Sequence, residues 1–229
     1  MSDGYELKKY EFDKVPEPLV NFILDYVSKD SHGHREDSFK DNVLHCTELL
    51  YCLRKAYYDR IFIEEQLRDE EINVSEKLKK VHHIFRGRLF DELLVTENLF
   101  EKVQVPVTHR IKGTDILIRG VADFIYEDRV WDLKAPSYSS KSKLPKKEHI
   151  RQVAFYTWAL AMVNGGLIYI TPHKILTVEI DFDIDFLEDN VEYMEERALC
   201  LTNCLRGGTP PPQERSTFCR WCPYKDICD

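Results

Sequence analysis

The segment from Lys102 to Leu133 constrains the fold more than any other part of the chain. Apolar and often β-branched residues alternate in it with polar ones, and two polar interruptions, KGTD at 112–115 and YEDR at 126–129, divide it into three runs. A period of two is typical of strands with one covered face, and short turns of this kind join antiparallel neighbours. The segment therefore predicts a three-stranded antiparallel meander.

Helical periodicity surrounds this meander on both sides. A helix is predicted over 47–62, opened by Thr47 as its cap, and further helices and strands follow from the same patterns. The other predicted helices are 17–29, 76–100, 148–163 and 185–205, and the other predicted strands are 166–171 and 174–180. This order predicts an α/β fold with a mixed sheet flanked by helices. We divide the chain into an N-terminal helical extension, 1–42, and a main domain, 43–229.

Composition limits the class of protein. The 229 residues are 43% apolar, which suits one globular domain, and no stretch approaches the roughly 18 apolar residues of a membrane span. The first residues lack the pattern of a signal peptide. Three of the seven cysteines fall in the last eleven residues, which favours a metal site in a reducing compartment over a disulfide framework. We therefore expect a cytoplasmic protein.

Charge is unevenly distributed along the chain. The formal net charge is -8, yet the segment from Lys134 to Arg151 contains six basic residues and only one acidic residue. The segment 179–196 is strongly acidic instead. Such asymmetry fits one surface that faces a polyanion. A solvated basic loop would explain the same pattern.

The predicted hairpin around Glu127 and Asp128 places acidic residues together. If these two residues form the turn, Asp123 lies across from Asp132, with Cβ atoms about 4.5–5.5 Å apart. Lys134 shares a strand face with Asp132 because it is two residues further on. Two carboxylates form a hard oxygen site suited to Mg2+ or Mn2+, beside which a lysine orients or deprotonates a water. A surface ion pair remains the structural alternative.

Three motifs in this order resemble the RecB-type nucleases of the PD-(D/E)xK superfamily. They are G-x-x-D at Gly120–Asp123, D-x-K at Asp132–Lys134, and Q-x-x-x-Y at Gln152 and Tyr156, two residues that share a helical face. The resemblance implies a restriction-endonuclease-like fold. It also implies that the aspartates bind the metal, that Lys134 assists the attacking water, and that Gln152 and Tyr156 hold the substrate and the site.

The cysteine spacing narrows the resemblance. Cys52 stands far from the C-x2-C-x5-C tail formed by Cys219, Cys222 and Cys228. This division resembles the iron-sulfur cluster of the CRISPR-associated RecB-type exonucleases, the Cas-four family, and of AddB-type helicase-nucleases. It implies a cluster, with 4Fe-4S favoured and 2Fe-2S open, that joins the N-terminal helices to the tail. On chemistry alone, a structural zinc site is the alternative. The remaining cysteines are interpreted as ordinary thiols; these are Cys46, Cys200 and Cys204.

One position departs from the family pattern. Asp91 follows Gly87 by four residues, where the family has a histidine ligand. The resemblance thus implies a metal site of Asp91, Asp123 and Asp132, to which Leu133 adds only its backbone carbonyl. A third carboxylate would shift the metal preference or weaken turnover.

Together these likenesses imply a metal-dependent deoxyribonuclease, an exonuclease that acts on single-stranded DNA ends during CRISPR spacer acquisition with the CRISPR integrase as partner. The basic residues expected to contact DNA phosphates are Lys141, Lys143, Lys146, Lys147 and Arg151. One alternative is a catalytically weak iron-sulfur DNA-binding adaptor, which Asp91 favours. Another is a restriction or repair endonuclease of the same superfamily. A homo-oligomer stays open.

Overall fold

A computed structural model describes residues 40–62, 100, 102–136, 144–170, 175–215, 219–220 and 222–228. The predicted helices 17–29 and 76–100 lie outside these ranges, apart from Phe100, as does nearly all of the extension 1–42. No helix in the described ranges is both long and apolar enough to span a bilayer.

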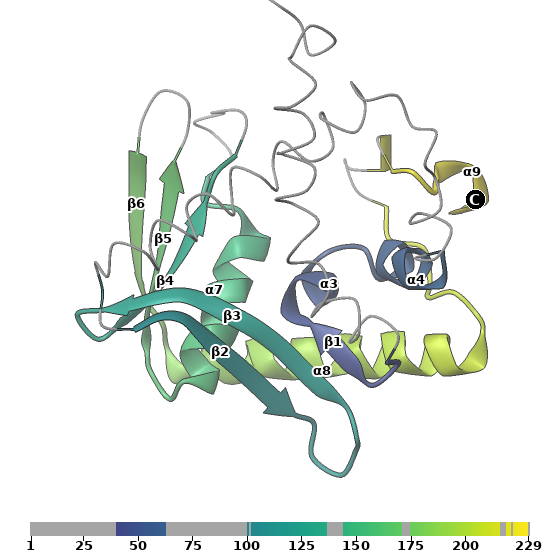
Figure 1. Cartoon of the computed structure of the whole chain (residues 1–229), viewed down its shortest axis with the longest axis horizontal. Coiled ribbons are helices and arrows are strands. Elements are labelled where there is room, and N and C mark those ends of the chain that lie inside the picture. The colour runs from purple at the N-terminus through teal and green to yellow at the C-terminus, as the bar shows by residue number, and fades with distance from the viewer. Residues whose placement is uncertain are drawn as a thin grey trace, which may run out of the picture.

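In the part of the chain that the structure describes, six strands form one mixed sheet, and five of them were predicted (Figure 1). The strands are β1 (Val43–His45), β2 (Lys102–Arg110), β3 (Leu117–Tyr126), β4 (Arg129–Lys134), β5 (Asn164–Ile170) and β6 (Ile175–Asp181). The β2–β3–β4 meander is antiparallel, as predicted. β1 and β3 are parallel, as are β4 and β5, whereas β5 and β6 are antiparallel. The expectation of a mixed sheet with flanking helices is confirmed.

The long strand β3 has different partners at its two ends. β2 pairs with it along one edge, from Leu117 to Ile125. On the other edge, β1 pairs with residues 117–119 and β4 pairs with residues 124–126. Residues 120–123 therefore lie between two partners on that edge among the described strands. Asp123 and Gly120 both fall in this interval.

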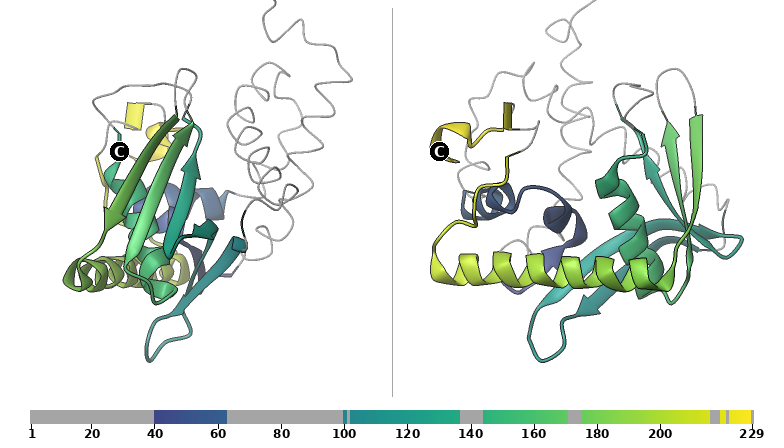
Figure 2. Two further views of the ribbon diagram at one scale, coloured as in Figure 1. Left: turned by 90° about the vertical axis from the view of Figure 1, so that its left-hand side faces the viewer. Right: turned by 180° about the vertical axis from the view of Figure 1, so that it is seen from behind.

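Helices α7 (Lys147–Ala159) and α8 (Ile184–Gly207) cover one face of the sheet (Figures 1 and 2). α7 contributes Phe155 and Tyr156 to the main core, while α8 contributes Met194 and Leu201, all at most 2% exposed. α8 extends beyond the sheet toward the α4 end of the molecule (Figure 2). It ends at Gly208, whose φ of 67° is a left-handed conformation that glycine adopts without strain.

The N-terminal helix prediction was wrong in detail. Residues 47–62 form two helices, α3 (Cys46–Leu50) and α4 (Leu53–Ile61), and His45 rather than Thr47 is the N-cap of the first. Its backbone N–H donates to Glu48 Oε2 at 2.7 Å, which completes a capping box. The break at Tyr51–Cys52 has a tertiary cause, because Arg197 of α8 donates to the carbonyls of Leu49 and Tyr51.

The C-terminal tail, which includes α9 (Lys225–Cys228), docks on α4. Tyr58 Oη donates to the Ile227 carbonyl at 3.2 Å, and Tyr224 Oη donates to Asp59 Oδ1 at 2.9 Å. The rings of Tyr58 and Tyr224 also lie 5.3 Å apart. Two ends of the domain, more than 160 residues apart in sequence, are thereby held together.

Candidate active site

The β3–β4 hairpin has the predicted register. Glu127 and Asp128 form its two-residue turn with φ values of 48° and 57°, the left-handed pair that a tight hairpin turn requires. Tyr126 pairs with Arg129, and Phe124 pairs with Trp131. The ladder stops there, one position before Asp123 and Asp132. The strands diverge where the two carboxylates begin.

Asp123 lies at an interruption of both ladders of β3. On the β2 side, pairs form at Val103–Phe124 and Val105–Ala122 but not at Gln104, whose φ is 48°. On the β4 side, Leu133 N–H donates to Asp123 Oδ2 at 2.5 Å. The carboxylate thus occupies the position of a strand partner, which directs it toward the residues around Leu133.

Asp132 and Lys134 form a close buried pair. Lys134 Nζ lies 2.8 Å from Asp132 Oδ2, and the Asp132 side chain is only 3% exposed. Burial raises the pKa of Asp132, against the opposing effect of Lys134. Burial opposes the charge on Lys134 too, but Asp132 and then Asp123 outweigh it and raise the lysine pKa. The ammonium therefore offsets one of the two negative charges of Asp123 and Asp132.

A line of hydrogen bonds continues from Lys134 to α7. Lys134 Nζ donates to Gln152 Oε1, and Gln152 Nε2 donates to Tyr156 Oη, each at 2.9 Å. Gln152 and Tyr156 are four residues apart and hence on one face of the helix. The two hydrogen bonds fix the amide orientation of Gln152, and Gln152 in turn holds the Lys134 ammonium in place.

Gly120 is required by Tyr156. A Cβ atom at position 120 would lie 2.4 Å from Tyr156 Cε1 and 2.8 Å from its hydroxyl oxygen. The phenol ring therefore rests directly on the backbone of β3, three residues before Asp123. Two strands and one helix thus bring together the residues of the three predicted motifs: Gly120, Asp123, Asp132, Lys134, Gln152 and Tyr156.

Comparison with known proteins identifies the superfamily of this chain. The family model of the PD-(D/E)XK nuclease superfamily matches residues 32–229. The chain belongs to this superfamily. It is also 23% identical over 215 residues to the CRISPR-associated exonuclease Cas4 of Saccharolobus solfataricus, a match that covers 92% of this chain and 97% of the relative.

One solved structure shows a similar fold, and a second is matched more weakly. The crystal structure of SSO0001 matches with a TM-score of 0.65 and 21% identity over 92% of this chain and 96% of that one. An alkaline exonuclease from Laribacter hongkongensis matches with a TM-score of 0.45 and 10% identity over 75% of this chain and 95% of that one. The first of these likenesses supports the mixed α/β fold with flanking helices.

Sequence reasoning missed several residues beside the superfamily motifs. Cys46 was interpreted as an ordinary thiol; it is fully buried, and burial followed by the charge of Asp132 raises its pKa. Tyr51 is near the same charges, because Lys134, Glu148 and Asp132 all affect its pKa, which burial raises. His149 precedes Gln152 by three residues, a helical spacing that would have found it.

The carboxylates fit a hard divalent metal. Asp132 Oδ2 is buried and, although it lies near Lys134 Nζ, it accepts no hydrogen bond of good geometry from a described residue. A buried anionic oxygen in that condition is a suitable ligand for Mg2+ or Mn2+. No three His, Cys, Asp or Glu side chains in the described ranges are grouped closely enough to hold a metal. Asp91, expected as the third carboxylate, lies outside those ranges.

The basic residues expected to contact DNA have different surroundings in the structure. Lys141 and Lys143 lie outside the described residues. Lys146 is the N-cap of α7 and Lys147 is its first, exposed residue. Arg151 instead donates to Asn190 Oδ1 at 3.0 Å and stacks 3.9 Å from the Tyr193 ring centre, both on α8. The α7–α8 interface thus engages its guanidinium, and its expected phosphate contact stays a prediction.

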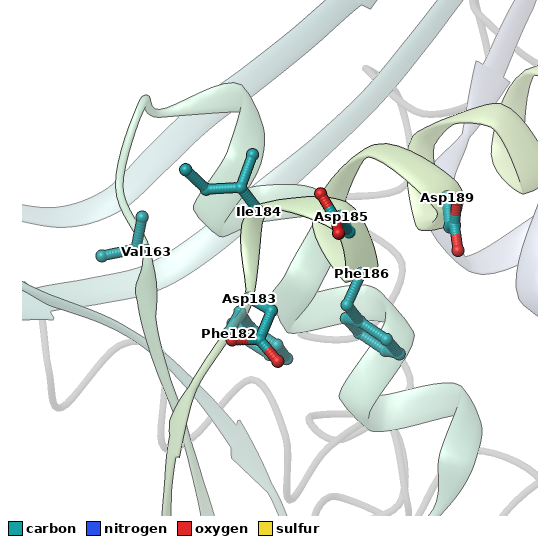
Figure 3. Close-up of a pocket in the computed structure, with 7 residues that line it drawn as sticks. All are labelled: Val163, Phe182, Asp183, Ile184, Asp185, Phe186 and Asp189. Carbon is teal, nitrogen blue, oxygen red and sulfur yellow. The ribbon is translucent and has the colours of Figure 1, made fainter.

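A pocket of about 590 Å3 lies at the far end of the sheet (Figure 3). Phe182 and Phe186 stack in it with ring centres 5.6 Å apart. It is lined by Val163, Phe182, Asp183, Ile184, Asp185, Phe186 and Asp189. Its three carboxylates repel phosphate, and Val163 is about 20 Å along β5 from Tyr169, the register partner of Lys134. This pocket is therefore not the site for a polyanion.

The cysteine tail is placed against the helix that Cys52 begins. Cys52 is the N-cap of α4, and Arg54 in the next turn donates to the Cys228 carbonyl at 2.5 Å and to its sulfur at 4.0 Å. Gln213 donates to the same sulfur at 3.9 Å. The four cysteines expected to bind the cluster all lie in the described ranges, but no three of them are grouped closely enough to hold a metal there. Thiols on two docked segments, with donors to sulfur, have the chemistry of iron-sulfur ligands.

Proposed function

We propose that this chain is a metal-dependent DNA exonuclease that acts on single-stranded ends and serves CRISPR spacer acquisition with the CRISPR integrase. The observation that carries the proposal is the continuous line from the carboxylates through Lys134 and Gln152 to Tyr156. Distant similarity to a CRISPR-associated exonuclease over 92% of the chain supports the biological role.

Asp123, Asp132 and the Leu133 carbonyl would hold Mn2+ or Mg2+, together with Asp91. Bound there, the metal would stabilise charge on the phosphate in an in-line displacement. The Leu133 N–H donates to Asp123, which holds residue 133 beside the carboxylates.

Lys134 is suited to orienting the attacking water. Its raised pKa keeps it an ammonium in the metal-free arrangement, and an ammonium donates hydrogen bonds but accepts none. Gln152 holds its nitrogen in place through a 2.9 Å hydrogen bond. Tyr156, whose pKa burial raises well above its ordinary value, stays protonated and fixes Gln152 in turn.

The iron-sulfur cluster is proposed on Cys52, Cys219, Cys222 and Cys228. Docking of α9 on α4 supports it, since the tail is anchored beside Cys52 by Arg54, Tyr58 and Tyr224. Iron and sulfide content after anaerobic purification tests the assignment. Cys228→Ala should lose iron, whereas Cys200→Ala, which alters a half-buried cysteine of α8, should retain it.

The nuclease is tested with end-labelled single-stranded DNA and Mn2+, Mg2+ or EDTA, with Asp132→Ala beside the wild type. Metal-dependent degradation should disappear in Asp132→Ala and persist in Asp189→Ala, which removes an exposed carboxylate of α8. Cutting of closed circular DNA would instead favour an endonuclease. Absence of cleavage by a folded, iron-loaded wild type would refute the exonuclease proposal, and strong DNA binding in that case would favour the adaptor.

A further inference from the structure

A buried histidine beside the site has no part in the mechanism above. His149 lies on α7 one turn before Gln152, about 4.5 Å nearer the start of the helix. Tyr169 on β5 is the register partner of Lys134, so the two side chains project from the same face of the sheet. Tyr169 Oη lies 3.0 Å from His149 Nδ1. The pair is therefore adjacent to Lys134 on the side toward the N-terminus of α7.

The hydrogen bonds around Tyr169 determine the tautomer of His149. The backbone N–H of Lys146 donates to Tyr169 Oη at 3.3 Å. Tyr169 is fully buried, and the described residues provide one acceptor for its hydroxyl proton, His149 Nδ1. Because a buried hydroxyl donor requires an acceptor, Nδ1 accepts and the imidazole proton resides on Nε2.

The imidazole is neutral at physiological pH. Burial, followed by the charges of Lys134 and Lys146, lowers the pKa of His149 to about 3. Burial raises the pKa of Tyr169 to about 12, so the phenol keeps its proton. The Nε2–H group then has no acceptor among the described residues, although the side chain is only 8% exposed. A directional donor is thus held ready beside two cations.

We propose that His149 Nε2–H binds a non-bridging oxygen of a DNA backbone phosphate next to the one that is cleaved, and that Tyr169 is the positioning residue that fixes its tautomer. This inference rests on the proposed function. A hydrogen bond to an anionic oxygen is strong and directional, and an uncharged donor does not repel a metal held by the neighbouring carboxylates.

The test is a scan with single methylphosphonate linkages, each of which replaces one charged phosphate oxygen by a methyl group. Anisotropy of labelled single-stranded DNA measures affinity in EDTA, where cleavage is blocked. We expect the wild type to lose affinity at one linkage near the end. His149→Ala should bind all-phosphate DNA about tenfold more weakly and show no further loss at that linkage. His149→Gln, which retains a donor, should recover much of the affinity.

His109→Ala is the matched control, since His109 is a half-buried histidine of β2 that pairs with Glu195 at 2.6 Å. It should bind as the wild type does. Tyr169→Phe keeps the ring but removes the hydroxyl, and it serves as the second variant if His149→Ala does not fold. Nitrogen-15 NMR should place the single imidazole proton on Nε2 in the wild type and show a mixture of the Nδ1–H and Nε2–H tautomers in Tyr169→Phe.

Three results are decisive. A proton on Nδ1 in the wild type overturns the inference. The inference is also overturned if His149→Ala retains full affinity and the methylphosphonate profile of the wild type. Either result leaves the proposed function intact if the wild type still binds and degrades DNA. A wild type that neither binds nor degrades single-stranded DNA overturns the proposed function, and this inference with it.

Discussion

Replacing Gly120 by alanine should disable the site through a single methyl group. The added Cβ would lie 2.4 Å from Tyr156 Cε1 and 2.9 Å from Cζ, whereas ordinary carbon contacts are about 3.5–4.0 Å. Gly120 does not have a positive φ, so alanine fits the backbone itself. The phenol ring must therefore move by roughly 1 Å.

This displacement acts on both stability and catalysis. Overpacking of a buried contact costs about 1–3 kcal/mol in the free energy of unfolding. Moving the phenol also breaks its 2.9 Å bond from Gln152, which holds Lys134. Because a misplacement of about 1 Å costs up to roughly 100-fold in rate, we expect kcat of Gly120→Ala to fall by about 10- to 100-fold.

Gly166→Ala is a control with nearly the same geometric conflict. Its Cβ would lie 2.4 Å from Trp131 Cε3, a ring that packs in a separate cluster with Phe124. Both variants should therefore lose comparable stability in urea denaturation. Only Gly120→Ala should lose rate on single-stranded DNA, measured where both variants are folded.

Either of two results would refute this positioning role of Tyr156 and Gln152. If Gly120→Ala retains full kcat, Tyr156 and Gln152 do not position the lysine. If both glycine variants lose rate equally, the loss reflects general destabilisation rather than the hydrogen-bond line. A double variant, Gly120→Ala with Tyr156→Leu, should recover stability without recovering rate.

The structure also predicts how three further changes affect stability. The pKa of His149 is about 3 in the folded protein and about 6.5 in the unfolded chain, so the stability contributed by its neutral form is lost as pH falls through that window. In urea denaturation, the stability of the wild type relative to His149→Gln should therefore drop by about 2 kcal/mol from pH 7 to pH 5. A stability difference that does not change with pH would contradict this. Arg197→Met should cost about 3 kcal/mol in unfolding free energy because it removes the ion pair of Glu214 and the donor to two backbone carbonyls, whereas the more exposed Arg206→Met should cost much less. Mn2+ at about 100 times its Kd should raise the wild-type thermal midpoint by about 5–10 °C and leave Asp132→Asn unchanged; an equal shift in both would place the metal elsewhere.

Local patterns were sufficient to predict the hairpin. The two-residue turn at Glu127–Asp128 fixes the β3–β4 register, and a strand period of two then puts Asp132 and Lys134 on one face. The four-residue spacing of Gln152 and Tyr156 fixes their helical face in the same way. Each of these inferences needs only neighbours in the sequence and one turn.

Features that depend on contacts between distant parts of the chain could not be predicted from the sequence. The break at Tyr51 exists because Arg197, 146 residues away, binds its carbonyl. The short strand β1 has three residues, too few to show a period. Tyr169 lies beside Lys134 only because β5 returns parallel to β4 after α7, and no local pattern fixes that register. The contact of Arg151 with Asn190 could not be predicted either, because its partner belongs to α8, 39 residues away.

The segment from Cys46 to Leu53 connects the site to the cysteine tail. Cys46 and Tyr51 are near Asp132 and Lys134, while the Leu53 N–H donates to Glu214 Oε2 at 3.3 Å, just before the tail. Arg197 binds both parts of this segment and Glu214. Loss of the proposed cluster would release the tail and disturb this segment before it affected the β3–β4 hairpin. A fall in nuclease activity after cluster loss would therefore follow from displaced packing, without any role of the cluster in the chemistry.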